Sequence, residues 1–588
     1  MNALIILLVA IAVLVCGYVF YGGWLAKQWG IDPNRPTPAH EFEDGKDYVP
    51  AAPYVVLGHH FSSIAGAGPI NGPIQAAIFG WVPVLLWVLI GGIFFGAMHD
   101  FGALFASIRH KGQTLATVIA ENIDDTAKKL FCIFSYLTLI LVVAAFASIV
   151  ASTFAVAPVP TDDAAKAVAV ETGNLANMRT AMISVLFIVV AVIYGVITRG
   201  RKIPAAANIV SALAIIVVVV ALGYNLPVIA LDNTTWMILV GLYILVASVA
   251  PVWILLQPRD YLSSYLLYGM IALALVGIIG AGVMGNAASL DIPAFTGFSA
   301  AAGTSKVAAS GFLFPALFIT IACGAISGFH SLVASGTTSK QLDREAEAQP
   351  IAYGGMLIEC VLALVSLCAV AYIWQDYKAG TTVTPTVVFA TGLSQMLGKI
   401  FGSGAVSVTY TLMVLAVSVF CLTSLDTATR LARYMFQEFW LKPGEKAGDP
   451  TVTGARKVLC NPYVSTAITV VLGIALGMTG YAKIWPLFGA ANQLLAGLGL
   501  LAVAAWLGKM GRNNKMFYFP MIFMILVTLT SLVFTIKSQI TAIIAGSTGV
   551  AWCYIRAILA ILLVILAIDL VVEGSKALAA QAKAKKAA

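Results

Sequence analysis

The chain has 588 residues, of which 60% are hydrophobic and only 10% are charged, with a formal net charge of +8. Soluble domains carry about 25% charged residues, so this composition indicates a polytopic integral membrane protein. The apolar runs are continuous rather than alternating, which predicts membrane helices and not a β-barrel. Most of the basic excess lies in short loops, a pattern that sets orientation in a membrane and does not indicate nucleic-acid binding.

Windows of about 20 residues predict an all-α fold with about fifteen membrane helices. The predicted spans are 2–23, 58–80, 82–106, 130–157, 181–198, 205–224, 236–257, 262–285, 311–338, 351–374, 403–425, 463–480, 484–507, 516–536 and 551–572. The first span lacks a basic start and a small-residue cleavage site, so we expect a retained helix. One set of alternate loops holds most Lys and Arg, which places the N-terminus outside and the C-terminus in the cytoplasm.

The second span is interrupted. Residues 58–73 read GHHFSSIAGAGPINGP, and a continuous helix tolerates this density of Gly and Pro poorly. At membrane depth, unwound backbone is stable only where protein, water or a ligand satisfies it, so the segment is a candidate binding site of a transporter. The alternative is close helix packing through Gly66, Gly68 and Gly72.

A half-helix that restarts near Pro69 would present free N–H groups and a positive dipole end, which suit a carboxylate. Glycine would let that ligand approach the backbone closely. The candidate substrate-binding residues come from this break and from a second one at 246–253. They are Gly66, Ala67, Gly68, Pro69, Asn71, Gln75, Ala250, Pro251 and Trp253.

The second interruption, with Pro251, lies five spans after the first, so the two breaks would cross the membrane in opposite directions. Five helices that begin with a broken one, repeated in inverted orientation, are a known transporter plan. The predicted regions are an N-terminal helix and loop (1–57), a first repeat (58–230), a second repeat (231–440) and four peripheral helices with a basic tail (441–588). The alternative is that Pro251 merely kinks a helix.

Polar residues inside predicted spans are candidates for ion or proton coupling. His330 is a proton-carrying candidate because the unperturbed pKa of histidine lies near neutrality, and Glu359 lies deep in an apolar span. Ser335, Thr337 and Thr338 offer hydroxyl oxygens to a proton relay or to Na⁺. The alternatives are that the hydroxyls bond back to the carbonyl four residues earlier, that His330 is a satisfied core residue, and that Glu359 locks neighbouring helices.

His59, His60 and Asp100 are candidate gate residues at the inner mouth. Neither their spacing nor the eight scattered cysteines match a metal-site motif, so no metal site, disulfide or resident cofactor is predicted. Asn492 and Gln493 lie in an apolar span and are expected to hydrogen-bond between helices.

Five strings resemble the signature blocks of the carbon starvation protein A family, in the family's order. They are GHHFSSIAGAGPINGP (58–73), QPRDYL (257–262), CGAISGFHSLVASGTTSKQ (323–341), TSLDTATRLARY (423–434) and WPLFGAANQLLA (485–496). The resemblance implies uptake of peptides or pyruvate during carbon starvation, across the bacterial cytoplasmic membrane. It also implies the leucine-transporter-type core of the amino acid–polyamine–organocation superfamily. In that superfamily a cation site often joins the first and eighth core helices, which suggests Ser63–Gly68 beside Ser335, Thr337 and Thr338.

The leading hypothesis is a secondary transporter of a small carboxylate-bearing nutrient, a short peptide or pyruvate, coupled to H⁺ or Na⁺. No nucleotide-binding loop or catalytic triad is found, so neither direct ATP coupling nor an enzyme is predicted. The alternative is a membrane sensor that binds the same ligands without net transport, and a channel is a third class. The lipid bilayer and a small molecule are the expected partners.

Overall fold

The computed structural model describes the chain except residues 1–2, 46, 161–163, 199, 202, 285–291, 300–310, 381–383, 443–444, 446, 547–548 and 588. Within the described residues, eleven helices are long and apolar enough to cross a membrane, and two further apolar helices are shorter. The all-α membrane fold predicted from composition is confirmed. The predicted count of fifteen spans is not.

Two sets of five elements form the core, and each set begins with a helix that is split into two short pieces. The first set is α4 (Pro53–Ile64) with α5 (Gly68–Ala76), α6 (Trp81–Gly91) with α7 (Ala97–Arg109), α9 (Asp125–Phe154), α12 (Asn233–Val249) and α13 (Leu256–Val283). The second set is α14 (Leu313–Thr320) with α15 (Gly328–Gly336), α16 (Gly354–Tyr372), α19 (Gly404–Trp440), α21 (Pro462–Gly477) and α22 (Tyr481–Lys509).

The packing relates the two sets as inverted copies. α4 packs on α15 and α5 packs on α14, so the two split helices run antiparallel. α9 lies along α19, α12 lies beside α21, and the last helices of the sets, α13 and α22, pack against α4 and α15. This is the five-plus-five inverted arrangement of a leucine-transporter-type core.

The prediction of a broken helix at 246–253 was wrong. α12 ends at Val249, and after six residues α13 begins at Leu256 and packs against other helices. Pro251 has no N–H to continue α12, and Arg430 Nη2 donates to the Ala247 and Ala250 carbonyls at 3.1 and 2.5 Å, which satisfies the helix end. The second break lies at 321–327 instead, between α14 and α15.

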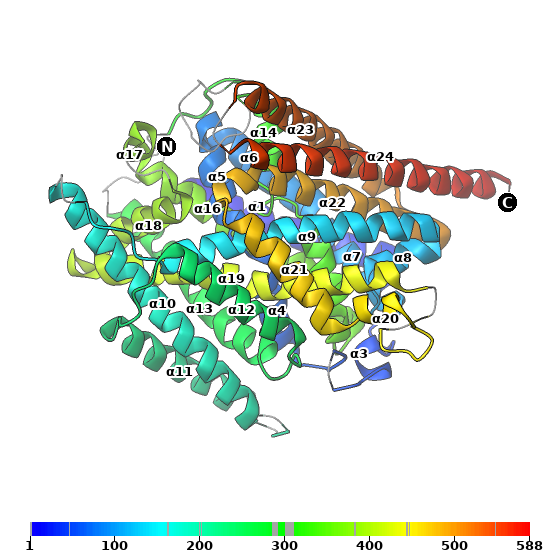
Figure 1. The fold of residues 1–588 in the computed structure, drawn as a ribbon, viewed down its shortest axis with the longest axis horizontal. Helices are drawn as coiled ribbons and strands as arrows, with labels where there is room; N and C mark the ends of the chain where they lie inside the picture. The colour runs from blue at the N-terminus through cyan, green and yellow to red at the C-terminus, as the bar shows by residue number, and fades with distance from the viewer. Residues whose placement is uncertain are drawn as a thin grey trace.

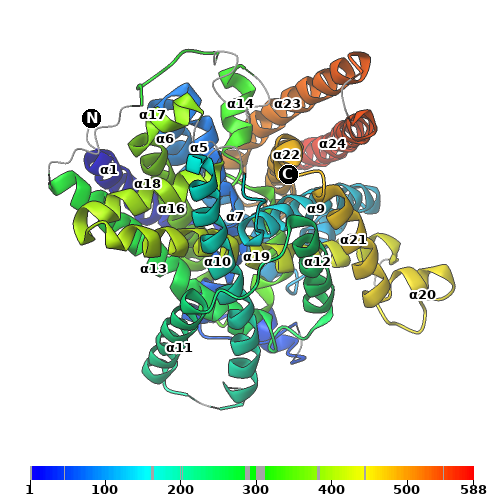
Figure 2. The same cartoon turned by 60° about the vertical axis from the view of Figure 1, so that its left-hand side comes forward.

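The remaining long helices surround this core (Figures 1 and 2). α10 (Ala164–Thr198) and α11 (Ala205–Asn225) lie at one edge, and α23 (Tyr518–Ile544) and α24 (Val550–Ala587) lie at the opposite edge. α1 (Ala3–Cys16) and α2 (Gly23–Trp29) precede the core, and α18 (Pro385–Phe401) precedes α19. The short helices are α3 (Pro38–Glu41), α8 (Leu115–Asn122), α17 (Trp374–Ala379) and α20 (Ala455–Leu459).

The helices differ in how far they are enclosed. On α11, Val210 and Val217 are 66% and 67% exposed, as expected for side chains that face lipid. α22, in contrast, is buried throughout 487–507. The functional core is therefore enclosed by other helices, and its polar residues are removed from both lipid and water.

Candidate functional site

The first split helix is interrupted where the sequence predicts. α4 ends at Ile64 and α5 begins at Gly68, with Pro69 in its first turn, where a missing N–H costs no helical hydrogen bond. The Gly66 N–H donates to the Ile64 carbonyl at 2.8 Å, and the Asn71 N–H donates to the Ala67 carbonyl at 2.8 Å. Residues 58–80 are all buried. The predicted interruption of the helix is confirmed.

The second break lies directly against the first. A Cβ placed on Gly68 would lie 2.3 Å from Cys323 Sγ, and one on Gly72 would lie 2.7 Å from the Thr320 carbonyl oxygen. Gly68 leaves the room that the Cys323 side chain fills, and Gly72 leaves room for the backbone of residues 320–321. The alternative reading, close packing through small residues, thus describes the state seen here.

Ala250, Pro251 and Trp253 do not face this break, so that part of the predicted site was wrong. The first two form the capped end of α12, described above. Trp253 lines a cavity of about 240 Å³ between α4, α10 and the start of α13, with Arg201 and Gln257 among its polar walls. Residues 320–323, on the second split helix, face Gly68 and Gly72, whereas Phe146 and Ser424 face Gly66.

Two amide side chains on α5 carry unpaired polar atoms in the interior. Asn71 and Gln75 are each 1% exposed. The Asn71 Oδ1 atom and both polar atoms of the Gln75 amide have no hydrogen-bond partner among the described residues. Buried amides without partners cost roughly 1–3 kcal/mol each, which makes Asn71 and Gln75 candidate ligand-binding side chains beside the break.

Asn492 and Gln493 stabilise the unwound segment 321–327 of the second break. The sequence assigned these two residues only to hydrogen bonds between helices. The Phe329 N–H donates to Asn492 Oδ1 at 2.8 Å. The Gln493 amide donates to the carbonyls of Phe318, Ile321 and Ala322, each at 3.1 Å. These bonds satisfy backbone that the unwound segment exposes. The expected helix–helix hydrogen bonding is confirmed, and the signal for the wider role was an Asn–Gln pair inside an apolar span.

Four buried residues from α7, α15 and α16 form what we call the acid–histidine cluster: His99, Asp100, His330 and Glu359. Asp100 contacts two imidazoles, His99 Nδ1 at 2.8 Å and His330 Nδ1 at 2.9 Å. His330 Nε2 lies 3.4 Å from Glu359 Oε2. All four side chains are 0% exposed. The structure thus brings together three predicted residues, His330, Glu359 and Asp100.

The bonding within this cluster leaves His330 Nε2 facing Glu359 without a hydrogen bond. An ionised Asp100 accepts only, so His330 donates its Nδ1 proton to that carboxylate and presents the Nε2 lone pair to Glu359. A lone pair and a carboxylate repel each other in a buried site unless a proton or a cation lies between them. The His330–Glu359 pair is therefore a candidate site for a proton or another cation.

The three predicted hydroxyl residues differ in what they contact. Ser335 Oγ and Thr337 Oγ1 donate to the carbonyls four residues earlier, at 2.7 and 2.9 Å, so the back-bonding alternative is confirmed for both. Thr338 Oγ1 lies 2.9 Å from His60 Nδ1. None of the three contacts the first break as the family resemblance suggested.

The family resemblance suggested that the eighth core helix contacts the end of the first, and α19 makes this contact with the end of α4. Ser424 Oγ donates to the Ser63 carbonyl at 2.9 Å, and Ser63 Oγ lies 3.2 Å from Thr427 Oγ1. By its packing along α9, α19 occupies the eighth position of the core, which the sequence analysis gave to 323–340. The oxygen atoms between the first and eighth core helices therefore belong to Ser63, Ser424 and Thr427.

The gate candidate His59 belongs to a second buried group, which we call the arginine cluster: His59, Tyr243, Arg259, Asp260 and Asp426. His59 Nδ1 lies 2.6 Å from Asp260 Oδ2, and Arg259 Nη2 lies 2.5 Å from Asp260 Oδ1. Arg259 also pairs with Asp426, and the Tyr243 hydroxyl donates to Asp426 at 2.5 Å. This cluster joins α4, α12, α13 and α19. His59 and His60 are 0% exposed and line no open mouth in this state.

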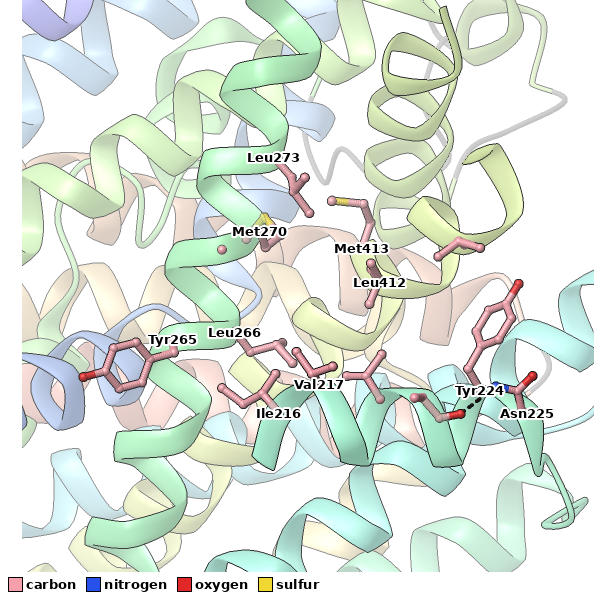
Figure 3. A pocket seen from close by; sticks show the side chains of 14 residues that line it. Ile216, Val217, Tyr224, Asn225, Tyr265, Leu266, Met270, Leu273, Leu412 and Met413 are labelled. Carbon is pink, nitrogen blue, oxygen red and sulfur yellow. Dashed lines mark hydrogen bonds between the residues drawn. The ribbon is translucent and has the colours of Figure 1, made fainter. Parts of the chain in front are cut away.

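A larger cavity, of about 450 Å³, has no polar character suited to a carboxylate. It lies between α11, α13 and α19, and Figure 3 shows its aliphatic and methionine walls. Tyr224 and Asn225 stand at one end, and the Asn225 amide already donates to the Ala221 carbonyl at 2.8 Å. A carboxylate-bearing substrate is better matched by the polar atoms beside the breaks.

Comparison with known proteins bears on this arrangement. Residues 2–381 and 374–531 match the family described as carbon starvation protein CstA. The chain is 33% identical to the peptide transporter CstA of Bacillus subtilis (strain 168), over 88% of this chain and 87% of that one. It is 30% identical to the pyruvate/proton symporter BtsT of Escherichia coli (strain K12), over 87% of this chain and 78% of that one. A manganese transporter structure from Eremococcus coleocola aligns with 92% of this chain and 99% of its own at a TM-score of 0.48 and 14% identity.

Proposed function

Because this chain belongs to the carbon starvation protein CstA family, we propose that it imports a short peptide or pyruvate by proton symport. It is a multi-pass membrane transporter and not an enzyme. The proposal adds a substrate class, a coupling ion and a site. It is supported most directly by two abutting helix breaks beside an unsatisfied histidine–carboxylate pair.

The substrate site in this proposal lies between the two breaks. The substrate carboxylate meets the N-terminal end of α5 near Pro69, where the helix dipole favours an anion. Asn71 and Gln75, whose polar atoms lack partners when the breaks are closed, then bond the rest of the ligand. The structure is closed, so substrate entry requires the split helices to move away from each other.

The coupling ion in this proposal is H⁺, carried by the acid–histidine cluster. A proton shared between His330 Nε2 and Glu359 relieves the repulsion described above. Since α15 carries His330 and continues directly from the second break, loading the proton and closing the breaks are linked. Na⁺ is the competing choice, because Ser63, Ser424 and Thr427 supply oxygen atoms beside the first break.

We further propose that the protein lies in the bacterial cytoplasmic membrane with its N-terminus outside and its C-terminus in the cytoplasm. This orientation follows from the excess of Lys and Arg in one set of alternate loops. Induction during carbon starvation belongs to the same proposal and rests on the family alone.

The test is uptake of labelled pyruvate and of a labelled dipeptide by purified protein in liposomes, with a proton gradient and a sodium gradient imposed separately. The proposal expects accumulation of at least one substrate when the outside is acidic. Accumulation driven only by the sodium gradient would identify Na⁺, and not H⁺, as the coupling ion. Binding without accumulation would identify a sensor, and unsaturable flux that ignores both gradients would identify a channel.

The same assay isolates His330. We expect His330→Gln to abolish proton-driven accumulation while exchange of internal for external substrate continues, because exchange needs no net proton movement. His40→Gln, at an exposed histidine paired with Asp343, is the matched control and leaves uptake unchanged. Proton-driven accumulation at the wild-type level in His330→Gln would remove this residue from the mechanism.

A further inference from the structure

We propose that Cys323, His330 and Glu359 form a binding site for a divalent transition-metal ion of the zinc type. Cys323 lies within the second break, His330 in the first turn of α15, and Glu359 on α16. The three residues do not form a known metal-binding spacing motif, so the sequence alone does not indicate the site. The inference uses residues of the proposed coupling site, but it holds whether or not the protein moves protons.

The ligand atoms are already gathered. One sulfur, one imidazole nitrogen and one carboxylate oxygen lie within 4.8 Å of one another. The 3.4 Å between His330 Nε2 and Glu359 Oε2 is long for a hydrogen bond, which prefers about 2.7–3.2 Å. Two ligands at about 2.05 Å from a tetrahedral ion are separated by about 3.35 Å, so this distance fits a metal between them.

The nitrogen and oxygen atoms that would bind the metal are free of hydrogen bonds, and the Cys323 thiol makes only long contacts. His330 Nε2 and both carboxylate oxygens of Glu359 have no hydrogen-bond partner among the described residues, and all three ligand side chains are at most 1% exposed. Buried polar atoms are nearly always paired. Two unpaired atoms of different residues, His330 Nε2 and Glu359 Oε2, face each other at 3.4 Å beside the Cys323 thiol, and this is the independent observation that points to a cation.

Neighbouring residues hold the ligands in place. Asp100 fixes the His330 ring through Nδ1 at 2.9 Å, the contact that metal-binding histidines usually make with a carboxylate. Cys323 Sγ lies 3.7 Å from Ser327 Oγ and 3.8 Å from Asn492 Nδ2. Gly68 leaves the space that the Cys323 side chain fills.

The ligand types select the metal. Thiolate with imidazole and one carboxylate suits Zn²⁺ or Co²⁺, whereas Mg²⁺ and Ca²⁺ take oxygen ligands. Three protein ligands leave a fourth position open for water or substrate. The metal and the shared proton exclude each other, because both require the Nε2 lone pair of His330.

The test is titration of purified, metal-free, full-length protein in detergent with Co²⁺, which reports thiolate ligation by a charge-transfer absorption band. We expect one Co²⁺ per chain with this band. Cys323→Ser removes the band, whereas Cys360→Ser, at a buried cysteine next to Glu359, keeps it. As a positioning residue, Asp100 should affect affinity alone, so Asp100→Asn weakens binding by about 10–100-fold with the band intact.

Two results would overturn the inference: no band in the wild-type protein at saturating Co²⁺, or an unchanged band in folded Cys323→Ser. If that variant does not fold, zinc-edge X-ray absorption on the wild type decides instead. One sulfur at about 2.3 Å from zinc is expected, and a shell of nitrogen and oxygen only would contradict the site. These readouts do not depend on transport, so they fail or succeed separately from the proposed function.

Discussion

Arg259 is the residue that keeps two buried carboxylates compatible with a membrane interior. Its guanidinium pairs with Asp260 and Asp426 while being 2% exposed. Burying one charge costs several kcal/mol, and this cost is offset only where several hydrogen bonds and an opposite charge surround it. Arg259 and Asp260 fall between the predicted spans 236–257 and 262–285, so no pattern in the sequence indicated a buried cluster. The Arg259 partner Asp426 could not be chosen from the sequence either, because it lies 167 residues away.

We expect Arg259→Met to destabilise the protein by about 3–5 kcal/mol, because it leaves two uncompensated carboxylates in the interior. Thermal unfolding in detergent measures this. The triple variant Arg259→Met with Asp260→Asn and Asp426→Asn should recover most of the loss. Lys576→Gln, in an exposed ion pair with Glu573, is the control and changes little. Unaltered unfolding of Arg259→Met would show that the cluster contributes nothing.

Asp47, in the loop before α4, makes the stability of the folded protein depend on pH in the acidic range. Burial on its own raises the pKa of Asp47, but Lys340, Arg430 and Arg433 nearby outweigh it and lower that pKa. A lowered folded pKa stabilises the protein above the unfolded pKa of about 3.9, and this stabilisation is lost as the pH falls through the folded value.

Asp47→Asn should therefore reduce stability at neutral pH and reduce the further loss of stability below about pH 4. Thermal unfolding across a pH series is the measurement, with Glu41→Gln as the control in the same exposed segment. An unchanged acid limb in Asp47→Asn would mean that the three cations do not act on this carboxylate.

At the scale of the helices, one of the two helix breaks could be predicted from the sequence and the other could not. The break at 65–67 was predicted because Gly66, Gly68 and Pro69 disfavour a continuous helix locally. The break at 321–327 was missed, because its unwound backbone is held by Gln493, from a distant helix. Pro251 was misread because a proline that ends a helix and a proline that breaks one look alike until the packing is known.

The candidate site was predictable in the same uneven way. His330, Glu359 and Asp100 could be named because charged or titratable groups in apolar spans are rare. That they form one cluster depends on how α7, α15 and α16 pack, which no local pattern specifies. α18 was missed for a related reason: its polar sequence reads as a loop, although one face is buried, with Phe389 and Leu393 at 0% exposure.

The contact between the two breaks predicts the effect of one added methyl group. Gly68→Ala puts a Cβ 2.3 Å from Cys323 Sγ, so the breaks can no longer close together and we expect uptake to be lost. Gly269→Ala, on α13 with nothing within 4 Å of its Cβ, is the matched control and keeps uptake. Full uptake by Gly68→Ala would mean that close contact at this point is not part of the transport cycle.

At the scale of the whole molecule, the inverted pairing of the two sets explains why the site lies in the middle. The antiparallel split helices place both unwound segments at the same depth, where backbone dipoles and buried polar side chains meet. The state described is closed, since residues 58–80 are buried throughout. A carrier must open this region first to one side of the membrane and then to the other.

The most direct measurement is the labelling of Cys323 by a membrane-impermeant thiol reagent in liposomes. The protein for this test retains Cys323 as its only cysteine. The account predicts that substrate and a proton gradient change the labelling rate, that bound substrate protects the thiol in part, and that modification stops uptake. Continued normal uptake while Cys323 stays unreactive under every condition would contradict a pathway between the two breaks.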